Sequence, residues 1–322
     1  MKKFMKICKK NQMELKKWLE KVLRNYYKGI VNGDGFLYAK GNVPVLLTAH
    51  MDTVHKEQCD YIEIMKVEGN TILSSKKGIG GDDRCGIWMI YRILRDTKFR
   101  PSILFCEDEE IGGVGSDKFT KTKYMDDLKE LKYFIELDRA NADDAVYYDC
   151  GNEEFKEYIE KVTGYKESYG SFSDISHLSP VADKASVNLS CGYYKAHTTN
   201  EYVVFEEMEN TVEAVKKLLA DADNVDAFDY QEANYWNDDN VFDWFGDGNK
   251  TVLFNDDDDY DRLDKMNYEI IFMENGKEEW DYISAYSYAE ALGYLFEAHP
   301  TITYNDVLDY YTYDEIGTIV NL

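Results

Sequence analysis

Apolar and polar positions along the chain follow two periods, which predict strands that alternate with helices. Short apolar runs with the length of buried strands cover residues 43–48, 102–106, 133–137 and 185–190. Apolar residues three and four positions apart, as on one face of a helix, occur within residues 13–23, 87–94, 153–162 and 212–219. This alternation predicts an α/β fold with a mostly parallel mixed sheet flanked by helices. Loops that carry function are then expected at the carboxyl ends of the strands.

Turn-forming residues add hairpins to this plan. The turn sequence Asn32-Gly33-Asp34-Gly35 separates two short apolar stretches, and Glu68-Gly69-Asn70 does the same within residues 61–74. Towards the end of the chain, residues 268–273 and 280–286 alternate around Asn275-Gly276, a two-residue sequence typical of hairpin turns. A helical pattern at 288–299 and a strand pattern at 302–313 complete a predicted small α+β module.

Charge divides the chain near residue 225. The formal net charge is −25. Residues 1–224 hold 38 acidic and 33 basic side chains, whereas residues 225–322 hold 24 acidic and four basic ones. We therefore expect a large first domain at 1–224, an acidic linker at 225–262 and a small acidic accessory domain at 263–322.

Composition argues against several classes of protein. An acidic surface repels phosphates, so we expect no nucleic-acid partner. No run of 18 apolar residues is present, and the Lys-rich start lacks the apolar segment of a signal peptide. We therefore expect no membrane association and a cytoplasmic location. The six cysteines show no C-x-x-C spacing, which argues against a disulfide framework or a thiolate zinc site.

Side chains able to bind metal follow the predicted strands. Imidazole nitrogen and carboxylate oxygen are zinc ligands, and a close pair of metal ions needs a carboxylate shared between them. Five residues at strand or turn ends fit this description, with Asp82 as the natural bridge: His50, Asp82, Glu110, Asp138 and His197. The sequence thus predicts two Zn²⁺ ions, with Co²⁺ or Mn²⁺ as alternatives.

Two further carboxylates lie beside these ligands. Glu109 precedes Glu110, and one of this pair can act as general base while the other binds metal. Asp52 follows His50 by two positions and can accept the ring N–H, which fixes the imidazole tautomer. We expect both Glu109 and Asp52 to serve catalysis. A solvated charge run is the simpler interpretation of residues 107–110, but their place between a strand and a Gly-rich turn favours a site.

The order of five motifs resembles the co-catalytic di-zinc exopeptidases, the superfamily of peptidase T, carboxypeptidase G-type enzymes and bacterial aminopeptidases. All five lie within residues 43–222: Ala49-His50-Met51-Asp52-Thr53-Val54, Gly80-Gly81-Asp82-Asp83-Arg84-Cys85-Gly86, Asp108-Glu109-Glu110-Ile111-Gly112, Leu137-Asp138 and Ala196-His197-Thr198-Thr199-Asn200-Glu201. The resemblance implies a zinc-dependent exopeptidase in which the five ligands hold two ions and Asp82 bridges them. It also implies that Asp52 supports the site and that Glu109 is the general base.

Spacing departs from one branch of that superfamily. Asp138 and His197 are 59 positions apart, which leaves no room for the lid domain inserted there in the peptidase T-like branch. The core is in this respect similar to single-domain aminopeptidases, whose Ser-Asp-His segment and Tyr-rich approach to the last His are echoed by residues 173–177 and 193–194. Tyr194 or His177 is then a candidate to stabilise an oxyanion. The spacing of 32 between His50 and Asp82 is more similar to the lidded branch, and Arg84 stands where Lys is common.

We therefore expect an aminopeptidase that acts on short peptides. A metal-dependent N-acyl amino acid deacylase or dipeptidase on the same core stays open, as does a non-enzymatic binding protein that works through the acidic C-terminal domain. Residues 225–322 contain 12 of the 27 Tyr and three of the five Trp, which suits a surface for a protein partner. A solvated appendage that stabilises the core is the alternative.

Overall fold

The computed structural model describes residues 1–67, 69–170, 172–231, 266–274, 277–285, 294–295, 298–299 and 307–313. The chain divides into two units, Met1–Asn234 and Tyr235–Leu322. The three expected ranges, 1–224, 225–262 and 263–322, stay predictions. Among the described helices, none is both long enough and apolar enough to cross a membrane.

An eight-stranded sheet forms the centre of the first unit, in the order β1-β2-β6-β3-β7-β10-β8-β9. Its strands are β1 (Val31–Gly33), β2 (Phe36–Ala39), β3 (Val43–His50), β6 (Pro101–Cys106), β7 (Tyr133–Arg139), β8 (Asp144–Val146), β9 (Lys166–Ser168) and β10 (Ser186–Ser190). The four central strands β6, β3, β7 and β10 run parallel to one another, as do β8 and β9. The other three pairings are antiparallel. The predicted α/β fold with a mostly parallel mixed sheet is confirmed.

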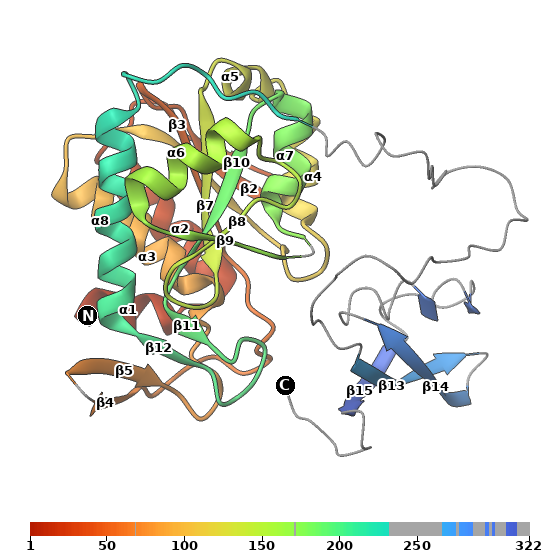
Figure 1. Ribbon diagram of the computed structural model, residues 1–322. Helices are drawn as coiled ribbons and strands as arrows, with labels where there is room; N and C mark the ends of the chain where they lie inside the picture. Colours follow the sequence, from red (N-terminus) through yellow and green to blue (C-terminus); the bar gives the residue numbers. More distant parts are fainter. Residues whose placement is uncertain are drawn as a thin grey trace, which may run out of the picture. The chain divides into compact units, whose positions relative to one another are not determined.

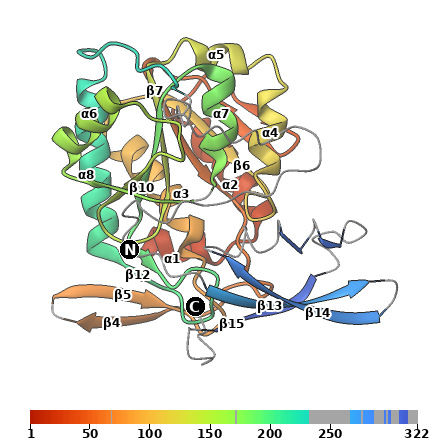
Figure 2. The ribbon, with the colours of Figure 1, turned by 45° about the vertical axis from the view of Figure 1, so that its right-hand side comes forward.

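Helices cover both faces of this sheet, as Figures 1 and 2 show. The larger apolar cluster involves α1 (Lys2–Cys8), α2 (Gln12–Leu23), α3 (Gly81–Asp96), α6 (Glu153–Thr163) and α8 (Phe205–Asp221). The smaller one involves α4 (Val114–Thr120), α5 (Met125–Lys129) and α7 (Asp174–Ala182). Alternation along β3 explains the two clusters, because Leu47 packs into the first and Leu46 into the second. Strands buried on both faces account for the continuous apolar runs in the sequence.

A second sheet of four short strands, in the order β11-β12-β5-β4, lies apart from the first (Figure 2). The strands are β4 (Glu63–Val67), β5 (Asn70–Ser74), β11 (Tyr193–Tyr194) and β12 (Tyr202–Val204). The β4–β5 hairpin was expected, but its pairing with β12 was not. This pairing matters because the loop between β11 and β12 carries His197.

The described part of the second unit is a three-stranded antiparallel sheet in the order β14-β13-β15. Its strands are β13 (Met266–Glu274), β14 (Lys277–Ala285) and β15 (Val307–Tyr313). Tyr268, Ile270 and Phe272 alternate along β13 and are buried. The antiparallel pairing of β13 with β14 confirms the expected hairpin. Most of the expected helix at 288–299 and most of the expected linker fall outside the described residues.

Candidate metal centre

Three parallel strands bring their carboxyl ends to one edge of the large sheet. His50 is the last residue of β3, and Asp138 is the last residue but one of β7. Glu109 and Glu110 follow the end of β6 at Cys106, which lies opposite His50 in the sheet register. Parallel strands end at the same edge, so side chains 28 to 88 positions apart meet there.

Asp82 enters this edge from the first turn of α3. Gly80 precedes that helix with a φ of 66°, a left-handed conformation that favours glycine. Asp82 itself has non-helical φ and ψ, and the Asp82–Asp83 peptide bond is cis. One oxygen of the Asp82 carboxylate lies 2.8 Å from Nε2 of His50, and the other lies 3.2 Å from Nε2 of His197. Asp82 therefore lies between the two imidazoles.

The remaining ligand candidates flank Asp82 on either side. Oε2 of Glu110 lies 3.1 Å from Nε2 of His197, and Oδ1 of Asp138 lies 3.4 Å from Nε2 of His50. Two overlapping groups hold ligand atoms within 4.8 Å of one another, namely His50 with Asp82 and Glu110, and His50 with Glu109 and Asp138. The structure thus brings together all five predicted ligands and Glu109.

Two carboxylate oxygens in this cluster fit a bound cation. Oε1 of Glu110 and Oδ1 of Asp138 are buried and accept no hydrogen bond from any described residue. Buried carboxylate oxygens are normally paired or bound to metal, because removing a charge from water is costly. The donor set of two imidazoles and three to four carboxylates suits divalent zinc, and it suits other divalent ions that bind nitrogen and oxygen.

Electrostatics in the cluster point the same way. Burial, with Asp82 as the next contribution, raises the pKa of Asp138 to about 8. Burial also raises the pKa of Glu109 to about 10, with Asp138 adding to the shift. For His197 burial lowers the pKa, but hydrogen bonds to Asp82 and Glu110 outweigh it and raise the value to about 11. These raised pKa values mean that Asp138, Glu109 and His197 hold protons in the metal-free site. A bound cation can replace these protons, because it neutralises the negative charge of the carboxylates.

Asp52 holds three of the groups at this edge. Its Oδ1 lies 3.1 Å from Nδ1 of His50 and accepts the backbone N–H of Glu109, also at 3.1 Å. Its Oδ2 accepts the backbone N–H of Glu110 at 3.1 Å. Accepting from Nδ1 leaves Nε2 of His50 free for a metal, and the two amide bonds orient the Glu109-Glu110 turn. The sequence predicted the contact with His50 but not the bonds to the turn.

Three supporting residues were not anticipated. Asp83 accepts the backbone N–H of His50 at 3.1 Å, and Asn188 on β10 accepts that of Asp138 at 2.9 Å. Glu201, fully buried, accepts the backbone N–H groups of Gly80 and Asp82 at 2.7 and 3.0 Å. Asn188 could have been noticed as a polar residue inside an apolar strand, between Val187 and Leu189.

Tyr194 and His177 make their contacts elsewhere. The hydroxyl of Tyr194 donates to Oε2 of Glu207 at 2.7 Å, and its ring stacks on Tyr202. Nδ1 of His177 lies 3.0 Å from Oγ of Ser116. Among the described residues, none of these contacts is with a metal-ligand candidate. Their predicted part in oxyanion stabilisation stays a prediction.

Comparison with known proteins agrees with this geometry. Residues 37–179 match the model of peptidase family M28. The match spans His50, Asp82, Glu109, Glu110 and Asp138, and ends before His197. The resemblance to the co-catalytic zinc exopeptidases is confirmed. With it, the chain is assigned to the metallopeptidase class of hydrolases. A search of curated protein sequences finds no match.

Solved structures share the fold at low sequence identity. Aminopeptidase PepT from Bacillus cereus aligns with a TM-score of 0.52 and 16% identity, over 69% of this chain and 97% of that one. A tripeptidase from Staphylococcus aureus aligns with a TM-score of 0.54 and 12% identity, over 69% and 97%. A TET aminopeptidase from a Thaumarchaeota archaeon aligns with a TM-score of 0.50 and 12% identity, over 68% and 97%. At these identities the likeness shows the fold.

Proposed function

We propose that this chain is a di-zinc aminopeptidase that hydrolyses short peptides. The position of Asp82 carries the proposal, because its two carboxylate oxygens face His50 and His197 from opposite sides. With Asp138 beside one imidazole and Glu110 beside the other, this arrangement supports two ions that share Asp82. Zinc is the first choice for such nitrogen and oxygen donors, and Co²⁺ or Mn²⁺ are the alternatives.

The chain's own residues supply the proton transfers. When bound, two such ions polarise a carbonyl and lower the pKa of water. The carboxylate of Glu109 accepts a proton from the attacking water and returns one to the leaving amine. Asp52 keeps His50 in one tautomer and holds the turn that carries Glu109. Glu110 stays a ligand, since His197 lies against it.

The segment between Asp138 and His197 favours aminopeptidase action over deacylation. The 59 positions from Asp138 to His197 are taken up by the core elements β8, α6, β9, α7, β10 and β11. No inserted domain is present among these described residues to enclose a substrate carboxylate. A short peptide with a free amine suits such an open site.

Metal analysis combined with one cleavage assay tests the proposal. We expect about two zinc equivalents per chain and release of amino-terminal residues from short free-amine peptides. N-acylated amino acids should be poor substrates. Faster hydrolysis of the N-acylated compounds would favour the deacylase instead, and bound zinc without any cleavage would favour a binding protein. The cytoplasmic location and a protein partner for residues 225–322 stay predictions.

A further inference from the structure

The start of this acidic chain is basic. Residues 1–24 carry nine basic and two acidic side chains, although the formal charge of the whole chain is −25. Most of these basic residues lie on α1, on α2 or in the turn between them. Phe4 of α1 packs against Trp88 of α3, with ring centroids 6.2 Å apart, which fixes the position of α1 on the first unit. A fixed cationic surface therefore lies on an anionic protein.

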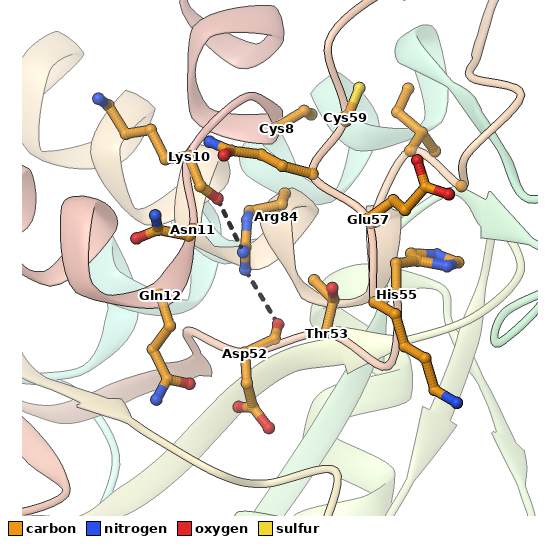
Figure 3. A pocket seen from close by; sticks show the side chains of 15 residues that line it. Cys8, Lys10, Asn11, Gln12, Asp52, Thr53, His55, Glu57, Cys59 and Arg84 are labelled. Atoms are coloured by element: carbon orange, nitrogen blue, oxygen red, sulfur yellow. Dashed lines mark hydrogen bonds between the residues drawn. The ribbon is translucent and has the colours of Figure 1, made fainter.

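Three cavities follow α1 and share lining residues. The first, about 430 Å³, has Lys10, Lys56 and Asp52 among its lining residues, and Figure 3 shows Lys10 and Asp52 on either side of Arg84. The second, about 470 Å³, shares Lys10 with the first. The third, about 320 Å³, shares Lys3 and Lys6 with the second. Shared lining residues place the three cavities next to one another along α1, and the first cavity also has Asp52 in its lining.

Several lysines that line these cavities have no acidic partner among the described residues. Within the described residues, no ion pair is made by Lys2, Lys6, Lys10 or Lys56. Lys3 instead lies over the rings of Trp18 and Tyr91, each centroid 5.5 Å from Nζ. We call the cavities lined by Lys2, Lys3, Lys6, Lys10 and Lys56 the α1 groove.

The acidic residues beside the α1 groove are already engaged. Asp52 accepts from two backbone amides and faces His50. Glu57 pairs with Lys77 at 2.9 Å. Arg84, at the base of the first cavity, donates to the backbone carbonyls of Asp52 and Lys10 (Figure 3). Concave surfaces lined by one sign of charge concentrate ligands of the opposite sign.

We propose that the α1 groove binds acidic side chains of a peptide whose scissile bond lies at the metal centre. The inference rests on the proposed aminopeptidase function and specifies its substrate class: short peptides with Asp or Glu downstream of the bond that is cut. Asp52 lines the first cavity and also contacts His50, which links the groove to the proposed metal centre through one residue. A peptide is favoured over nucleic acid because the function proposed for the adjoining centre is the cleavage of peptide bonds.

Two matched triple variants test the inference. The first is Lys2→Gln with Lys6→Gln and Lys10→Gln. The control is Lys98→Gln with Lys161→Gln and Lys217→Gln, which removes the same charge from exposed lysines outside the groove. We measure kcat/KM for an acidic and an uncharged peptide of equal length. The ratio of the two should fall about tenfold in the groove variant, since each exposed charge pair changes affinity by roughly 1.4- to 5-fold. It should be unchanged in the control.

An equal ratio in both variants overturns the inference. A binding measurement separates its failure from that of the proposed function. Anisotropy of a fluorescein-labelled acidic hexapeptide reports binding to the full chain without turnover. Binding that weakens with salt and with the groove variant supports the groove even if no peptide is cleaved. Tighter binding of a single-stranded oligonucleotide of equal charge, lost in the same variant, would overturn the peptide assignment.

Discussion

Glu201 accepts the backbone N–H of Asp82 at 3.0 Å, although 119 positions separate the two residues. Its other oxygen accepts the N–H of Gly80 at 2.7 Å and lies 2.8 Å from Nε2 of His55. Glu201 follows His197 by four positions on the loop between β11 and β12. A single buried carboxylate thus ties the segment that carries His197 to the turn that carries the proposed bridging ligand.

Glu201→Gln should weaken metal binding without unfolding the protein. The amide keeps the size of the carboxylate but replaces one acceptor oxygen by a donor that faces N–H groups. Such an unsatisfied buried contact costs about 1–3 kcal/mol. Loss of a residue that orients a ligand lowers metal affinity about 10- to 100-fold. Competition with a chromophoric zinc chelator measures the change.

Glu207→Gln is the matched control for Glu201. It removes the same charge nearby on α8, where Glu207 contacts Tyr194. Zinc affinity should stay at the level of the unaltered protein. The d–d absorption of bound Co²⁺ should change in Glu201→Gln alone, because it reports ligand geometry. Equal zinc affinity and equal spectra for both variants would remove Glu201 from the metal centre.

Glu109→Gln should retain metal and lose turnover. General bases contribute about 10²- to 10⁴-fold to rate, so kcat should fall by this factor. Glu107→Gln is the control, because it removes the same charge two residues earlier, where Glu107 pairs with Lys16 at 2.7 Å. Metal content is measured beside kcat. Loss of one metal equivalent in Glu109→Gln would indicate that Glu109 binds metal instead. Its ligand atom lies within 4.8 Å of those of His50 and Asp138, which is compatible with that role.

Much of the centre follows from where apolar runs stop. The runs that form β3 and β7 lead directly to His50 and Asp138, and parallel strands place their carboxyl ends together. Gly80 indicates a turn just before Asp82, and its positive φ is a conformation that favours glycine. Each of these signals is local in the sequence, and the parallel sheet brings the residues together at one edge. For this reason the candidate ligands could be predicted from the sequence.

The supporting contacts could not be predicted in this way. The place of Glu201 depends on β12 pairing with β5, with Val203 opposite Leu73. Strands of two or three residues show no periodicity, so neither β11 nor β12 is visible in the sequence. The bonds from Asp52 to the turn after β6 depend on backbone direction, which side-chain patterns do not encode. Closeness in sequence can also mislead. Tyr194 lies three positions before His197, but its hydroxyl donates to Glu207.

The metal-free protein should lose stability as pH rises. In the folded state the pKa of Asp138 is raised from 3.8 to about 8, so the folded state holds a proton that the unfolded state has released. A raised pKa contributes stability below the unfolded value and loses it as pH rises through the folded value. The Tm in the presence of chelator should therefore fall between about pH 4 and pH 8. Scanning calorimetry measures it.

Asp138→Asn isolates this contribution, because the amide does not titrate. The variant should show a shallower fall of Tm over the same pH range than the unaltered protein. Saturating zinc should abolish the difference in slope, since metal replaces the proton. Identical pH profiles for the two metal-free proteins would contradict the shift at Asp138.

Metal binding at pH 7 should release protons. Glu109, Asp138 and His197 have pKa values raised to about 10, 8 and 11, so all three hold protons at pH 7 in the metal-free site. Metal ligands must be deprotonated, which couples uptake of the ion to loss of the protons on Asp138 and His197, and the positive charge of the ion also favours the carboxylate form of Glu109. Calorimetric zinc titrations in buffers of different ionisation enthalpy count the protons, because the apparent enthalpy varies with buffer in proportion to their number.

His197→Ala provides the matched comparison for proton release. It removes one protonated ligand and leaves Asp138 and Glu109 in place, so the number released should fall by about one. Zinc affinity of the unaltered protein should rise with pH through pH 8, where Asp138 loses its proton, and should continue to rise because His197 loses its proton at a higher pH. A zinc enthalpy independent of the buffer would mean that the site is already deprotonated at pH 7. The hydrogen bonds from His197 to Asp82 and Glu110 would then not hold a proton on the imidazole.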